Sequence, residues 1–111
     1  MGKLEKTVHG DLENVIKSLE EKVCSGKNAF TRREVYSTTL EERKIEMRSY
    51  ERYNLVYRYG IGVSVLFVES AEDKVDITVM VTGTNYGILG LDMGDEGKTL
   101  RIFEEAIQDI G

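Results

Sequence analysis

The chain has one histidine, His9, and one cysteine, Cys24, and these two side chains are the best suited to metal binding or nucleophilic chemistry. A zinc centre needs several such ligands together, so one of each cannot form it. The carboxylates of Asp92, Asp95 and Glu96 could attract a hard cation, but they miss the spacing of a calcium-binding loop and equally suit the start of a helix. The sequence therefore predicts no metal site and no cofactor.

A catalytic cysteine needs a base held beside it. The residues between His9 and Cys24 have the pattern of a helix, which would hold the two about 20 Å apart at the rise per residue of an α-helix. Cys24 is then better explained as a small packing residue. The glycines between residues 83 and 94 fit neither common phosphate-binding pattern, and turns explain them better. Catalysis therefore ranks third, behind protein interaction and small-molecule binding.

The most distinctive stretch is residues 43–59, where tyrosine is interleaved with arginine and glutamate. Under strict alternation, Arg48, Tyr50 and Arg52 share one face of a strand. If the helices cover the opposite face, which carries Ile45 and Met47, the first set points outward. Tyr and Arg are favoured at the centres of interfaces. This pattern predicts a surface for a protein partner or for a second copy of the chain.

The same basic and aromatic residues could also stack on single-stranded nucleic acid. However, Glu46 and Glu51 interrupt the positive charge, and the formal net charge of −5 repels polyanions. No apolar run approaches the roughly 20 residues of a membrane-spanning helix. The sequence thus disfavours nucleic acid and a membrane as partners.

The alternative to a protein-interaction module is a small-molecule-binding domain. A helix carrying Phe103 and Ile107 would lie against the strand that carries Tyr53 and Tyr57, and a gap between them could hold an apolar or aromatic ligand. The two helical side chains could equally fill that gap, because a chain of 111 residues has little core to spare.

Two amphipathic helices are expected to cover a sheet. The first spans about residues 11–25, with Asp11 as its N-cap and Gly26 as its left-handed stop. The second lies near the end of the chain. Apolar residues recur at helical spacing in both, as Leu12, Val15, Ile16, Leu19 and Val23 in the first and Leu100, Phe103, Ile107 and Ile110 in the second.

The strands are predicted from alternation with a period of two. A short strand at residues 4–9 opens the chain, and residues 61–67 and 75–82 pair through a hairpin at residues 70–73. Residues 43–59 could form one long strand, and residues 30–39 an edge strand with Val35 pointing inward. A brief strand is possible at residues 88–91.

These elements give the order β-α-β-β-β-β-α, an α+β fold with an antiparallel sheet and two helices packed on one face. The same order occurs in the TATA-binding-protein-like and helix-grip folds, an analogy of topology that says little about function. The chain contains no proline and no Ser/Gly-rich linker, so residues 1–111 are predicted to form a single domain.

Three short motifs carry a family resemblance. They are Tyr50-Glu51-Arg52-Tyr53, Thr82-Gly83-Thr84-Asn85 and Gly94-Asp95-Glu96. With the opening strand and helix, they resemble small bacterial proteins of the domain-of-unknown-function 6054 family. The resemblance covers most of the chain from about Arg43 onward, and it implies no activity, ligand or catalytic residue.

The charged opening residues 1–6 lack the apolar stretch of a secretory signal, and a lone Cys24 cannot form a disulfide within the chain. The sequence therefore predicts a cytoplasmic protein. Its predicted function is a non-catalytic protein-interaction or self-associating module, with the small-molecule-binding domain as the alternative.

Overall fold

The computed structural model describes residues 2–26, 29–54, 59–84 and 95–110. Their elements follow one another as β1 (Gly2–His9), α1 (Leu12–Val23), β2 (Thr31–Leu40), β3 (Arg43–Asn54), β4 (Tyr59–Ala71), β5 (Lys74–Thr84) and α2 (Asp95–Gln108). This confirms the predicted order and the α+β class.

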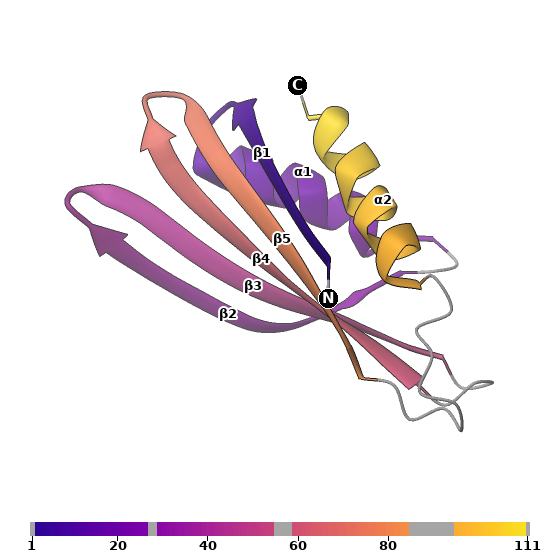
Figure 1. The fold of residues 1–111 in the computed structure, drawn as a ribbon. Helices are drawn as coiled ribbons and strands as arrows, with labels where there is room; N and C mark the ends of the chain where they lie inside the picture. The colour runs from indigo at the N-terminus through magenta and orange to yellow at the C-terminus, as the bar shows by residue number, and fades with distance from the viewer. Residues whose placement is uncertain (1, 27–28, 55–58, 85–94, 111) are drawn as a thin grey trace.

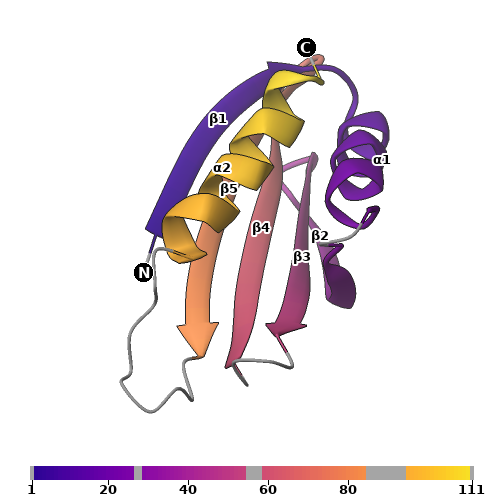
Figure 2. The same ribbon diagram turned by 90° about the vertical axis from the view of Figure 1, so that its right-hand side faces the viewer.

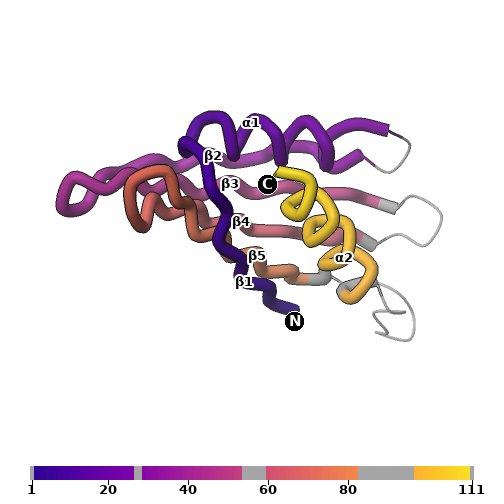
Figure 3. The backbone as a smooth tube through the Cα atoms, turned by 90° about the horizontal axis from the view of Figure 1, so that it is seen from above, coloured from indigo at the N-terminus to yellow at the C-terminus, as the bar shows by residue number. Residues whose placement is uncertain are grey.

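The strands form one antiparallel five-stranded sheet in the order β1-β5-β4-β3-β2. Strands β2 to β5 make a meander of hairpins, whereas α1 carries the chain from β1 at one edge to β2 at the other. Both helices lie on the same face of the sheet, with α2 over β1 and β5 and α1 nearer to β2 (Figures 1, 2 and 3). Neither of the two described helices lies over the opposite face.

Each helix forms where its apolar stripe predicted it. In α1, the side chain of Asp11 accepts a hydrogen bond from the backbone N–H of Glu13 at 3.1 Å, which confirms the N-cap. Gly26 has a φ of 92°, as a left-handed stop requires. The stripe residues of α1 are buried, as Leu12, Val15, Ile16, Leu19 and Val23.

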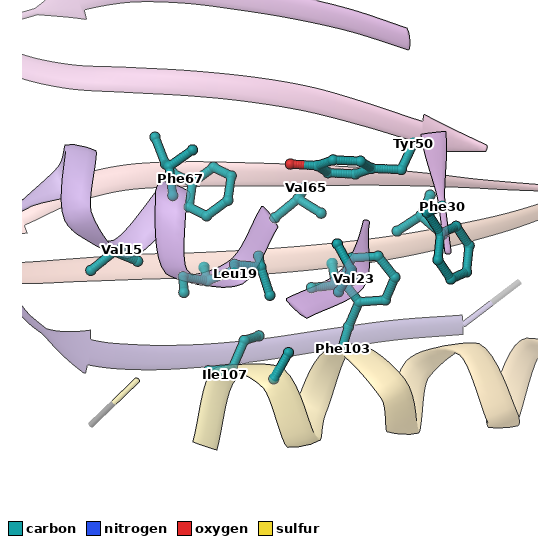
Figure 4. Packing of buried hydrophobic residues seen from close by; sticks show 14 of the residues in the cluster. Val15, Leu19, Val23, Phe30, Tyr50, Val65, Phe67, Phe103 and Ile107 are labelled. Carbon is teal, nitrogen blue, oxygen red and sulfur yellow. The ribbon is translucent and has the colours of Figure 1, made fainter. Parts of the chain in front are cut away.

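The core lies between the helices and the alternating side chains of β4 and β5. The predicted inward sets are buried, namely Ile61, Val63, Val65 and Phe67 on β4 and Val75, Ile77, Val79 and Val81 on β5. From α2, Phe103 is fully buried and stands edge-on to Phe30 at 5.3 Å between ring centroids (Figure 4). Apolar burial on one face is therefore what holds the two layers together.

Two strand predictions need correction. The long strand expected over residues 43–59 ends at Asn54, and Tyr59 belongs to β4. Val35 lies on the helix-covered face, because it pairs with Arg48, but its side chain is 45% exposed. Strand β2 lies at the rim of the helical layer, so facing that layer does not bury its residues. The strand suggested at residues 88–91 falls outside the described residues.

Candidate functional site

The predicted binding residues Arg48, Tyr50 and Arg52 do share one face of β3, but it is the covered face. Tyr50 pairs with Val63 and is only 1% exposed, whereas Met47 on the other face is 44% exposed. The expectation that this set points outward is therefore wrong. The register of β3 with β4 determines which face of β3 is covered. Val63 and Val65 face the helices, so their partners on β3, Tyr50 and Arg48, face the helices too.

Arg48 is held in a partly buried cluster of charges between β3 and α1. One of its Nη atoms donates to Glu20 at 2.6 Å, and its Nε donates to Glu46 on the same strand. Burial lowers the pKa of Arg48, but the hydrogen bond and the charges of the two carboxylates outweigh it and raise the pKa overall. Arg32, on β2, also reaches Glu20 at 3.4 Å. The cluster thus fastens α1 to the sheet.

The ring of Tyr50 belongs to the core. It lies 6.1 Å from the ring of Phe103, with a tilt of 52° between the planes (Figure 4). Arg52 covers the other side of this aromatic group, with its guanidinium 4.9 Å from the centroid of the Phe30 ring. A tyrosine buried in this way cannot stack on a nucleic-acid base. Tyr50 therefore contributes to packing of the core and not to binding.

The hydroxyl of Tyr50 is buried and has no hydrogen-bond partner among the described residues. Burial raises the pKa of the phenol well above its usual value, and the negative charge of Glu20 adds to the rise. The neutral phenol is therefore the form that the fold accepts.

Replacing Tyr50 with phenylalanine is expected to raise the free energy of unfolding by about 1 kcal/mol at pH 7, because it removes an unsatisfied buried hydroxyl. Because the pKa of the Tyr50 phenol is higher in the folded than in the unfolded state, the wild-type protein keeps its full stability below about pH 10. It loses stability as the pH rises further, since the unfolded state then ionises more readily. The gap between variant and wild type should therefore widen above pH 10. Urea unfolding of both proteins at pH 7 and pH 10.5 measures this difference in the free energy of unfolding.

Tyr53→Phe is the matched control, since Tyr53 is half exposed on the other face of the same strand. It should leave stability unchanged at both pH values. If Tyr50→Phe were destabilising instead, the hydroxyl of Tyr50 in the wild-type protein would have to make a hydrogen bond.

The predicted ligand pocket beneath α2 is not formed by its proposed residues. Phe103 and Ile107 are buried at 0% and 2% exposure and fill the space against the sheet. Tyr53 lies on the face away from α2 with 50% exposure, and Tyr57 falls outside the described residues. The three described side chains are therefore not brought together, because Tyr53 is on the opposite face of the sheet from the other two.

The lone cysteine and histidine do not form a reactive pair. His9 is the last residue of β1 and is exposed, whereas Cys24 is the C-cap of α1, at the opposite end of that helix. Burial raises the pKa of the Cys24 thiol, and Glu20 adds to the rise while Arg32 opposes it. A thiol with a raised pKa is a poor nucleophile at neutral pH. Within the described residues, no group of His, Cys, Asp and Glu is placed to hold a metal ion, and no helix is long and apolar enough to cross a membrane.

The exposed apolar side chains gather on the β2–β3 hairpin, which the sequence analysis did not single out. Three of them, Tyr36, Leu40 and Met47, lie on the uncovered face and are here called the hairpin surface, and their exposed fractions run from 44% to 64%. Tyr36 pairs across the strands with Met47, which pairs with the half-buried Leu66. A usable signal was present, because residues 35–40 carry no charge between two strongly charged flanks.

Two grooves border this hairpin. One, of about 220 Å³, separates the first half of α1, at Leu12 and Ile16, from the end of β2 at Thr38. The other, of about 460 Å³, lies at the hairpin ends and is lined mainly by carboxylates, those of Asp11, Glu41, Glu42, Glu69, Glu72 and Asp73. This second groove, whose lining also includes Arg43, therefore carries mostly negative charge.

Comparison with known proteins gives a family and no function. No curated protein and no solved structure is similar enough to the chain to count as a match. The model of one family, described as a family of unknown function (DUF6054), matches residues 1–111. The resemblance inferred from the sequence is thereby confirmed: the chain belongs, over its whole length, to the DUF6054 family of unknown function.

Proposed function

We propose that this protein is a non-catalytic interaction module that self-associates through the hairpin surface. The observation that carries the proposal is where its exposed apolar side chains lie. Among the large hydrophobic side chains of the described residues that are exposed, all but Met80 belong to β2 or β3. Apolar and tyrosine side chains collected in one place on an otherwise charged surface favour a protein partner.

The alternative, a small-molecule site beneath α2, has less support. Phe103 and Ile107 fill the space that a ligand would need, and the half-exposed Tyr53 lies on the opposite face. The lone Cys24, which has no second cysteine in the chain to pair with, suits a reducing compartment. We therefore place the module in the cytoplasm, and in bacteria on the strength of the family resemblance.

Self-association should appear as a mass that rises with concentration from the 12.6 kDa of one chain to a clean multiple of it. Tyr36→Lys places a charge in the middle of the hairpin surface and is expected to return the protein to a monomer. Native mass spectrometry and sedimentation velocity measure the change.

Met80→Lys is the matched control. Met80 is also exposed and lies on the same uncovered face, but on β5, away from β2. It should leave the mass unchanged. A wild-type protein that stays monomeric at every concentration would refute self-association. If Tyr36→Lys and Met80→Lys weakened self-association equally, the interface would be the whole uncovered face and not the hairpin surface alone.

A further inference from the structure

The two edges of the sheet differ in how they are protected against pairing with another chain. The edge strand β1 carries Lys3, Glu5 and Lys6, and charged residues are a common device that discourages edge pairing. On β2, residues 35–40 have no charge and no proline, and every residue of the strand is exposed. Its β-bulge lies earlier, between Arg32 and Glu34. The later part of β2 is therefore an unprotected edge.

From these observations we infer that two copies of the chain pair through β2, antiparallel and centred on Ser37, so that their two sheets become one continuous sheet. The inference rests on the proposed self-association and specifies its geometry. In an antiparallel strand pair related by a two-fold axis, the helix-covered faces of the two sheets lie on the same side if paired residues are both even-numbered or both odd-numbered. A centre on Ser37 meets this condition, with Tyr36 beside Thr38 of the second copy.

The charges that flank the neutral segment select this register. Arg32, Arg33 and Glu34 precede it, and Glu41 and Glu42 follow it, with Arg43 and Lys44 next along the chain. Counted along the strand, centring on Ser37 places Arg33, at the β-bulge, near Glu41 of the other copy, twice by symmetry. Centring on Thr38 instead would set Glu34 against Glu42 of the second copy, and centring on Tyr36 would leave Glu41 opposite Thr31. Charge complementarity therefore favours one register and a second copy as the occupant.

The groups needed for these contacts are exposed. Arg33 makes a 3.3 Å contact with Glu51, and both side chains are largely exposed, so its guanidinium has further N–H groups to donate. Glu41 and Glu42 make no ion pair within the part of the chain that the structure describes. They also border the acidic groove at the hairpin ends, and this acidic surface attracts the arginines of a second copy.

The hairpin turn gives a second reason to connect Glu41 and Glu42 with a partner. Both have positive φ, at 51° and 67°, a conformation usual for Asn-Gly and costly for other residues. Two adjacent glutamates there also repel each other. Arginines from a second copy would reduce this repulsion.

Pairing would also join the apolar rows of the uncovered face. The row of Tyr36, Met47 and Leu66 in one copy would continue into the row that runs through Thr38, Ile45 and Val68 of the other. Tyr36 and Met47, now 63% and 44% exposed, would then lie near the centre of the joined sheet. Burial of apolar area adds to the main-chain hydrogen bonds of the new strand pair.

The test uses charge reversal in the full-length chain. Arg33→Glu alone and Glu41→Arg alone should each weaken self-association at least about tenfold, because each sets like charges together at both symmetric contacts. An equimolar mixture of the two variants should recover a dimer that contains one chain of each, since the reversed charges again face opposite ones. Recovery in the mixture excludes misfolding as the cause.

A cysteine cross-link checks the register directly. Ser37→Cys in a Cys24→Ser background should form an intermolecular disulfide under mild oxidation, because directly opposed residues of paired strands lie within reach of one. Lys3→Cys, on the other edge strand, should not cross-link.

The outcomes separate the two proposals. A dimer that survives both charge reversals and gives no cross-link at position 37 would overturn the β2 pairing and leave self-association standing. A wild-type monomer at all concentrations would overturn both.

Discussion

Replacing Phe103 with alanine is expected to lower the free energy of unfolding by about 3–5 kcal/mol. Phe103 is fully buried and contacts the rings of both Phe30 and Tyr50, so its removal leaves a cavity where α2, β3 and the start of β2 meet. The native stability of a domain of this size is itself only about 5–15 kcal/mol. The variant should therefore be marginal, with a midpoint shifted to much lower urea.

The control for Phe103→Ala is Met80→Ala, which truncates a large apolar side chain that is 39% exposed. It should change the free energy of unfolding by less than about 0.5 kcal/mol. If Phe103→Ala were as mild as this control, the space beneath α2 could not be a filled core, and the small-molecule pocket would return as an explanation.

Replacing Arg48 with methionine is expected to cost about 2 kcal/mol of stability at pH 7. Methionine keeps the apolar stem of the side chain but removes the charge that Glu20 and Glu46 face. The side chains of all three are under 20% exposed, so water does little to screen the two carboxylates left behind. Urea titrations of variant and wild type give the difference.

Lys3→Met is the matched control, because the Lys3–Glu5 ion pair has side chains at least 60% exposed. It should change stability by less than about 0.5 kcal/mol. A loss for Arg48→Met as small as that for Lys3→Met would mean that the charge cluster does not fasten α1 to the sheet.

Periodicity in the sequence predicted most of the fold because each element buries one face. The stripe of α1 and the alternation in β4 and β5 mark their buried residues directly, and the capping residue Asp11 marks where a helix begins. The order of elements then left one place for two amphipathic helices, the face of the sheet that carries the Val and Ile side chains.

The candidate site was harder to predict because β3 carries large side chains on both faces. Alternation placed Arg48, Tyr50 and Arg52 together correctly, but it could not say which face the helices cover. That depends on the register of β3 with β4, in which Tyr50 meets Val63. The sequence also could not show that β2 lies at the rim of the helical layer, which leaves Val35 and Tyr36 exposed. Burial on β2 and β3 is therefore set by long-range pairing, which the local pattern of these two strands does not encode.

The pairing of β1 with β5 has a consequence for biosynthesis. The paired residues Thr7 and Asp76 are 69 residues apart along the chain. At a synthesis rate of about 5–20 residues per second, β1 therefore waits roughly 3–14 seconds on the ribosome before its partner strand is made. The β2–β3 and β3–β4 hairpins can form during that interval, whereas the first strand and the face that α1 buries stay exposed to other chains. The charges of Lys3, Glu5 and Lys6 discourage pairing of β1 with other chains during that wait.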